Sequence, residues 1–425
     1  MHSLTADLAY LTADLPGVGG VIKQRPEDFL VEEQPLYEPS GEGEHLYVFI
    51  EKRSRTTTEV ARHLARTFHV SRRHVGYAGL KDKHAITRQF FSIHLPDRSR
   101  DEEGLARISN NTVTLLWAAR HNNMLRRGHL AGNRFVIRIR QVNPTDVIHA
   151  RATLERLAES GVPNFLGDQR FGYRQHNHVL GRLLLLERWQ ELLDEMLGRP
   201  RDESEPTHPG RLAYERGDYA AALEVWPRHL RHDRQALDAL RQGKSARDAV
   251  MTIDREQRGF LLSGLQSALF NQVLDQRLRD GTFARLLPGD LAMKHSNGAV
   301  FAVDEATAEL ENAPGGRMHT QEISPTGPMW GPDMLLPTGQ VLELERRVLH
   351  EFGLTEADLA GRSVTEHVMA GSRRALRIFL RDPDISAGVD EHGPFIRVAF
   401  ELPRGSFATI VLREIMKTGA MADEM

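Results

Sequence analysis

The most informative stretch of the chain is GYAGLKDKHAITRQ, residues 76–89. Small residues at its positions 76, 78 and 79 leave room for another backbone or a ligand to approach closely. Asp82 lies between Lys81 and Lys83, and positive charge on both sides favours the ionised form of its carboxyl. A carboxylate kept ionised beside such a loop is suited to act as a nucleophile or an electrostatic stabiliser. A structural aspartate in a lysine-rich loop is the alternative.

The composition of the whole chain excludes several classes of protein. The chain has 425 residues, which at roughly 150 residues per domain suggests about two or three domains. It contains no cysteine, which excludes disulfides, thiolate nucleophiles, iron–sulfur clusters and thiolate zinc sites. No apolar run approaches the roughly 18–20 residues of a membrane-spanning helix, and the N-terminus lacks the features of a secretory signal. We therefore expect a cytoplasmic protein without a membrane partner.

Two motif fragments do not predict a cofactor. Residues 242–245, QGKS, resemble the end of a phosphate-binding loop, but Asp238 stands where the first glycine of that loop would be. His176 and His178 lie two positions apart, without a nearby cysteine or an HExxH motif. We therefore expect no bound nucleotide cofactor and no metal.

The charges of the chain are segregated. The formal net charge of -3 by itself argues against a nucleic-acid partner. However, residues 104–145 hold seven arginines and no acidic residue, and residues 52–74 hold seven Lys or Arg against one Glu. A third basic group lies at 373–381, whereas acidic residues gather at 187–205. Such basic segments suit phosphate binding, although solvated charged faces are the alternative interpretation.

Local patterns predict both helices and strands. Thr56 and Glu59 form a capping box, and apolar residues follow at helical spacing. In residues 134–140, apolar residues alternate with mainly basic ones, which predicts a strand. Further strands are expected at 90–94, 112–117 and 396–402, and helices at 146–160, 254–281 and after the turn at 403–405. Strands and helices do not alternate strictly, which favours an α+β fold, and the helix stop at 161–163 predicts a domain boundary.

The stretch at 76–89 resembles the signature of the TruD family of tRNA pseudouridine synthases, with Asp82 at the position of the catalytic aspartate. Six further segments resemble motifs of this family in the same order, so that the similarity spans about residues 19–415. They are IK at 22–23 with PEDF at 26–29, GNRF at 132–135, PNF at 163–165 with QRFG at 169–172, SALFN at 267–271, RRA at 373–375 and LPRGSFAT at 402–409.

The resemblance implies a fold. It is an α+β pseudouridine-synthase catalytic domain with a mixed, largely antiparallel sheet, interrupted by an inserted second α/β domain. The expected catalytic domain is discontinuous and comprises residues 1–158 and 378–425, and the TRUD-type insertion comprises residues 159–377. The similarity does not extend over about residues 175–258, whose role stays open.

The resemblance also implies a reaction. A uridine of tRNA, in this family uridine 13, becomes pseudouridine: the N1–C1′ bond breaks, the uracil turns, and C5 bonds to C1′. The reaction adds no group and changes no oxidation state, so it requires no cofactor. By the resemblance, Lys23 pairs with Asp82, and Phe29, Asn133 and Phe407 hold the flipped-out base. Asp82 would act through a covalent adduct or by abstracting a sugar proton to give a glycal.

Other assignments rest on weaker patterns. Phe135 is a further candidate for substrate contact, although its place in an alternating apolar face equally fits the core. The RNA backbone would lie on the basic segments, above all on Arg126, Arg127, Arg373 and Arg374. We expect a monomer whose partner is tRNA. The alternative is a non-catalytic RNA-binding protein that retains the fold.

Overall fold

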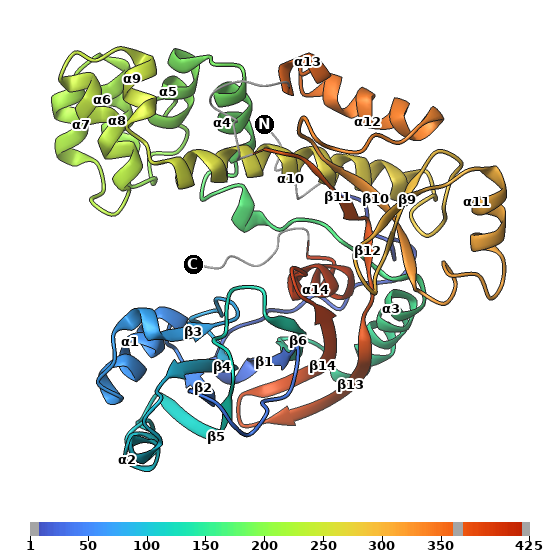
Figure 1. The fold of residues 1–425 in the computed structure, drawn as a ribbon. Helices are drawn as coiled ribbons and strands as arrows, with labels where there is room; N and C mark the ends of the chain where they lie inside the picture. Colours follow the sequence, from blue (N-terminus) through green and yellow to red (C-terminus); the bar gives the residue numbers. More distant parts are fainter. Residues whose placement is uncertain (1–7, 360–368, 419–425) are drawn as a thin grey trace. The chain divides into compact units, whose positions relative to one another are not determined.

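The computed structural model describes residues 8–359 and 369–418 and divides into two compact units (Figure 1). The sheet unit comprises residues 10–164 and 378–418, and the helical unit comprises the described part of 165–377 with residues 8 and 9. We predicted junctions after 158 and 377, and the chain divides after Asn164 and Arg377. The first junction is later because α3 (Val147–Ser160) and β7 (Val162–Pro163) complete the first unit.

The sheet unit is built on a mixed, largely antiparallel sheet, which confirms the predicted α+β class. Its order is β13–β14–β6–β1–β4–β2–β5, with β3 beside β4. Strands β1 and β4 run parallel, and the other neighbours are antiparallel. The strands are β1 (Phe29–Pro35), β2 (His45–Arg53), β3 (Val75–Tyr77), β4 (Ile86–His94), β5 (Val113–His121), β6 (Leu130–Arg140), β13 (Arg381–Asp390) and β14 (Gly393–Pro403).

Alternation along the strands separates a buried face from a charged one. On β6, Phe135, Ile137 and Ile139 are buried, as the sequence predicted. On the opposite face, charges of alternating sign lie on neighbouring strands, and the ion pairs Arg88–Glu51, Arg88–Glu32 and Arg134–Glu401 span 2.9, 3.0 and 3.3 Å. A register slip of one residue would bring these charges into the core, so the ladder helps to fix the strand register.

Helices cover the buried face. The predicted capping box of Thr56 and Glu59 is present at the start of α1 (Thr57–Thr67), and Val60 and Leu64 pack into a core with residues of β2 and β4. Helix α3 packs against β13 and α14 (Ala408–Met416), and α2 (Asp101–Ala106) precedes β5. The N-terminal and C-terminal parts of the chain thus share one fold.

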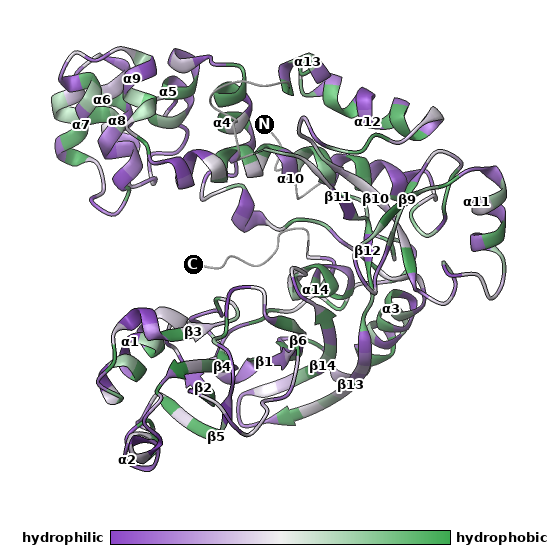
Figure 2. Ribbon diagram, viewed as in Figure 1, coloured by the Kyte–Doolittle hydropathy of each residue, from purple (hydrophilic) through white to green (hydrophobic). Residues whose placement is uncertain are grey.

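The helical unit is organised around α10 (Arg255–Arg279), which packs against α4, α12 and β10 (Figure 1). Helix α12 carries hydrophobic residues on one side and hydrophilic residues on the other (Figure 2). The other helices are α4 (Asn177–Leu185), α5 (Trp189–Leu197), α6 (His208–Glu215), α7 (Tyr219–Val225), α8 (Arg231–Arg241), α9 (Ala246–Met251), α11 (Glu305–Asn312), α12 (Gly339–Glu351) and α13 (Glu356–Leu359). The strands β8 (Leu291–Lys294), β9 (Val300–Ala302), β10 (Ile323–Met329) and β11 (Ser372–Ala375) form an antiparallel sheet of order β11–β10–β8–β9, and the short strand β12 (Arg377–Ile378) spans the second junction.

Candidate active site

Asp82 lies in the loop between β3 and β4, and the surrounding backbone fixes this loop. The Lys81 amide donates to Thr57 Oγ1 at 2.9 Å, which ties the loop to the start of α1. At Gly76, a Cβ atom would lie 2.3 Å from the Leu125 carbonyl oxygen, so this position requires glycine. At Gly79, by contrast, a Cβ atom would meet nothing within 4 Å. The space expected beside this loop is therefore filled by protein at 76 and open at 79.

Lys23 and Asp82 form an ion pair of 2.6 Å, with 13% and 29% of their side chains exposed. Val21 pairs with Arg140 at the end of β6, and this bridge positions the segment that carries Lys23. Lys23 itself has a φ of 57°, a left-handed conformation that is uncommon for residues other than glycine. The sequence resemblance implied this pair, and the structure brings the two side chains together.

The ionisation of Asp82 depends on two opposing effects. Partial burial disfavours the carboxylate, but the hydrogen bond and charge of Lys23 and the His84 amide together hold its pKa below the ordinary value. The stabilising charge therefore comes from Lys23, which is 59 positions away, and not from the two flanking lysines as the sequence suggested.

Lys52, which sequence analysis placed in an RNA-binding segment, is fully buried beneath the Asp82 loop. Its Nζ donates to the main-chain carbonyl oxygens of Asp82 and Arg55 at 2.7 and 2.6 Å. Burial lowers the pKa of Lys52 to about 8. The prediction of an RNA contact is therefore wrong for this residue. Its alternation with Val48 and Ile50, both buried, was the available signal.

Lys81 forms a second buried ion pair. Its Nζ lies 3.0 Å from Glu33 Oε2 and donates to Asn133 Oδ1, while only 5% of the Lys81 side chain and 1% of the Glu33 side chain are exposed. Glu33 on β1 lies directly opposite Asn133 on β6. Burial raises the pKa of Glu33, against the opposing charge of Lys81. Sequence analysis missed Glu33, although it alternates with the buried Phe29 and Val31.

The aromatic candidates are not equivalent. Phe29 is buried, its ring lies 4.7 Å from Lys23 Nζ, and it meets Phe135 edge to face at 6.5 Å. Phe135 is also buried and contacts Phe400 at 5.7 Å. Phe407 is half-buried just before α14, and no ring contact or hydrogen bond joins it to Lys23 or Asp82 in the described ranges. Phe29 and Phe135 therefore support the ion pair from the core.

The arginine candidates also differ from one another in exposure and in ion pairing. Arg126 and Arg127 are exposed and make no ion pair with any residue of the described chain, and the Gly128 amide beside them donates to the Ala78 carbonyl oxygen at 2.8 Å. Arg373 is 8% exposed and forms a 2.6 Å ion pair with Glu345, so the prediction of an RNA contact is wrong for Arg373.

Arg374 is also a poor candidate for the RNA backbone. Its guanidinium lies 5.5 Å from the centre of the Phe270 ring, and burial lowers its pKa to about 10. The basic group at 373–381 thus serves mainly the interior of the helical unit.

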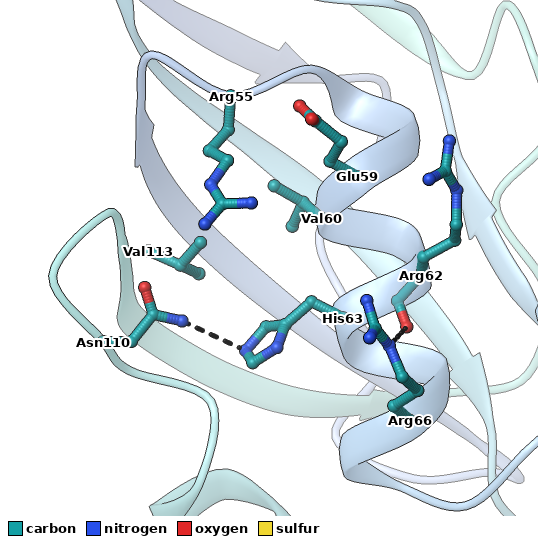
Figure 3. Close-up of a pocket in the computed structure, with 8 residues that line it drawn as sticks. All are labelled: Arg55, Glu59, Val60, Arg62, His63, Arg66, Asn110 and Val113. Carbon is teal, nitrogen blue, oxygen red and sulfur yellow. Dashed lines mark hydrogen bonds between the residues drawn. The ribbon is translucent and has the colours of Figure 1, made fainter.

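A basic pocket lies along the outer face of α1 (Figure 3). Arg62 and Arg66 stand one helical turn apart on α1, and Arg55 lies before it. None of the three pairs with a carboxylate among the residues that the structure describes. His63 Nε2 lies 2.8 Å from the Ile108 carbonyl oxygen and 3.4 Å from Asn110 Nδ2. Glu59 also lines the pocket, so three arginines face one carboxylate, and the net positive lining is suited to anionic ligands.

His176 and His178 are buried, and burial lowers their pKa values to about 3 and about 4. In residues 8–359 and 369–418, no group of three or more His, Asp or Glu side chains is arranged to hold a metal ion. Within the same ranges, no helix has the length and apolar character that crossing a membrane requires.

The chain is similar to known proteins over nearly its whole length. The family model for tRNA pseudouridine synthase D (TruD) matches residues 5–415. A tRNA pseudouridine synthase D of Geobacter sulfurreducens is 44% identical over 415 residues, 97% of each chain, and that of Syntrophotalea carbinolica is 41% identical over 96% of this chain and 99% of its own. A crystal structure from Methanosarcina mazei that is assigned to TruD superimposes with a TM-score of 0.83, at 28% identity and 96% coverage of both chains. The protein therefore belongs to the TruD family of tRNA pseudouridine synthases.

Proposed function

We propose that the protein converts a uridine of tRNA to pseudouridine and that Asp82 is the reacting carboxylate. The observation that carries the proposal is the ion pair of Lys23 and Asp82, in which the carboxyl is kept ionised but 29% exposed. An ionised carboxylate in a partly desolvated site is suited to nucleophilic attack or to proton abstraction. The membership of the TruD family and the relatives that carry this name support the same reaction.

Asp82 would start the reaction by one of two routes. In the first, its carboxylate attacks C1′, displaces uracil at N1 and forms a covalent adduct. In the second, it removes the C2′ proton, and uracil leaves to give a glycal. In both, C5 of the turned uracil bonds to C1′: in the first route this breaks the Asp82–C1′ ester bond, and in the second Asp82 returns its proton to C2′. A base then removes the C5 proton, a step that the freed Asp82 carboxylate can perform, and N1 takes up a proton. Lys23 holds the carboxylate in place and ionised.

The target base must leave its stack to reach Asp82. We propose that Asn133 holds its edge and that Phe407 stacks on its face, while Phe29 and Phe135 support Lys23 from below. The RNA backbone would bind to Arg126, Arg127 and the pocket on α1, because these arginines are exposed and unpaired in the described structure.

The variant Asp82→Asn tests the reacting group, because it keeps the shape of the side chain and removes its charge. We expect the release of tritium from RNA that contains 5-tritiated uridine to fall by at least about 100-fold. Asp146→Asn is the matched control, since Asp146 makes no capping hydrogen bond and lies outside the site. Near-normal turnover by Asp82→Asn would overturn the assignment.

A non-catalytic RNA-binding protein is the second candidate function, favoured only by the unpaired surface arginines. Tight tRNA binding by the wild type without tritium release or pseudouridine would support it. The proposed target is uridine 13, and pseudouridine mapping of cellular tRNA with and without the protein tests this position. A modified position elsewhere would contradict the choice of target but leave the role of Asp82 intact.

A further inference from the structure

The contact between Lys81 and Asn133 fixes which way the Asn133 amide faces. A lysine ammonium has three donors and no acceptor. The Asn133 atom that Lys81 Nζ contacts must therefore be the oxygen. The other polar group of the side chain is its NH₂, so a ligand that meets the end of Asn133 turned away from Lys81 meets donors.

Glu33 makes this orientation rigid. Glu33 Oε2 holds Lys81 Nζ at 3.0 Å, the Phe90 amide donates to Glu33 Oε1 at 3.4 Å, and Glu33 faces Asn133 across the β1–β6 pair. The side chains of Lys81 and Glu33 are almost completely buried. A buried ion pair adds little net stability compared with apolar residues, but it can specify one arrangement of its neighbours.

A donor at a fixed place suits a uracil that turns. The turn that exchanges N1 and C5 runs about the axis through N3 and C6, and it also exchanges the C2 and C4 carbonyl groups. The position taken by one carbonyl oxygen before the turn is thus taken by the other afterwards. In cytosine, one of these two positions carries an amino group, which is a donor and is repelled by another donor.

We propose that Lys81, held by Glu33, is a positioning residue that makes Asn133 a donor to the position that the O4 atom of uracil fills before the turn and the O2 atom fills afterwards. Lys81 thereby selects uridine over cytidine. This inference rests on the proposed function for the turn itself, but the selection between the two bases is a property of binding. Asn133 contacts the base, and Lys81 and Glu33 act through it.

Binding tests the selection in the Asp82→Asn background, where no turnover interferes. The probes are two tRNA transcripts that carry uridine or cytidine at the target position. We expect Lys81→Met to reduce the preference for uridine by about tenfold, because the amide becomes free to rotate and to accept from cytosine. Lys83→Met is the matched control, since Lys83 is an exposed lysine of the same loop. An unchanged preference in folded Lys81→Met overturns the proposal.

Lys81→Met alone leaves Glu33 buried without its partner and is at risk of misfolding. The double variant Glu33→Gln with Lys81→Met removes both charges and is expected to show the same loss of preference. A double variant that keeps the full preference for uridine also overturns the proposal.

Single-turnover rates with thio-substituted bases test the turn. Sulfur is a weaker acceptor than oxygen, so both 2-thiouridine and 4-thiouridine at the target should slow the wild type, by about tenfold more than they slow Asn133→Ala. If only one of the two thio-substitutions slows the wild type, or neither does, Asn133 does not contact the base both before and after the turn. If the wild type forms no pseudouridine but selects uridine through Lys81, the proposed function fails and the selection stands. If the wild type forms pseudouridine but its preference for uridine does not depend on Lys81, the proposed function stands and the inference about Lys81 fails.

Discussion

Lys23 and Asp82 are far apart in the sequence and form one chemical unit at 2.6 Å. Because Lys23 holds the pKa of Asp82 below its ordinary value, the carboxylate stays available as the solution becomes acidic. Lys23→Met removes the charge and the hydrogen bond, so the pKa of Asp82 should rise. We expect the acid limb of the kcat/KM profile to move to higher pH and the rate at pH 7 to fall by about tenfold or more. Tritium-release assays across pH 4–8 measure this, and an unmoved acid limb in Lys23→Met would contradict it.

The buried Lys52 should give the pH profile of kcat/KM an alkaline limb. Its pKa of about 8 means that its ammonium, which holds the Asp82 carbonyl oxygen, loses its proton above this pH. We expect kcat/KM to decline above pH 8 in the wild type and this limb to be absent from Lys52→Met, which should be about tenfold slower at pH 7.

The stability of the protein should follow the opposite trend with pH. The folded pKa lies below the unfolded value of 10.5, so the unfolded state binds more protons between pH 8 and 10.5, and the Lys52 contribution to the unfolding free energy rises through this window.

At the scale of elements, the loop before β6 and the outer face of α1 each present a pair of arginines without a carboxylate partner in the described structure. Changing Arg126 and Arg127 together to Gln should weaken tRNA binding and reduce the slope of log affinity against log salt by about 1 to 2, because up to two phosphate contacts are lost. Titrations at several salt concentrations measure the slope. Arg62 and Arg66 on α1 provide the second pair for the same measurement.

The control for these variants removes the same charge elsewhere. Arg231 and Arg247 are exposed residues of the helical unit, and changing both to Gln alters the net charge equally. If this control reduces the salt slope as much as the Arg126 and Arg127 variant, the loop is not a specific contact, and the effect reflects net charge.

Local patterns predicted the elements well, because their causes are local. The capping box before α1 and the alternation along β6 are properties of neighbouring residues, and both are present as expected. The burial of Arg373 could not be predicted in this way, because its partner Glu345 lies on a different element. Likewise, Glu33 and Lys81 meet only because β1 pairs with both β4 and β6, which no local pattern specifies. The ion pair of Lys23 and Asp82 was accessible only through the family resemblance.

At the scale of the whole molecule, one arginine joins distant parts of the sheet unit. Arg140 at the end of β6 pairs with the fully buried Asp28 at 2.7 Å and with Asp390 at the end of β13 at 2.8 Å. Asp28→Asn removes the buried charge partner, and we expect the sheet unit to lose roughly 3 kcal/mol of unfolding free energy. Hydrogen exchange of the β1 and β6 amides measures the unfolding free energy of the sheet unit separately from that of the helical unit.

Asp384→Asn is the control for that measurement. Asp384 pairs with Arg397 on the surface, with 57% of its side chain exposed, so its loss should cost less than about 1 kcal/mol. Equal effects of Asp28→Asn and Asp384→Asn would contradict a special role for the buried pair.

The pairing of β6 with β14 also has a consequence for synthesis on the ribosome. Strand β6 ends at Arg140 and β14 begins at Gly393, so about 250 residues separate the two. At roughly 5–20 residues per second, the β6 edge waits about 10–50 s for its neighbour. During this interval the strand that carries Asn133 is an open edge, exposed to aggregation or to capture by a chaperone. A nascent chain that stops between β6 and β14 therefore lacks a finished active site, even though every residue we assign to the reaction except Phe407 has already been made.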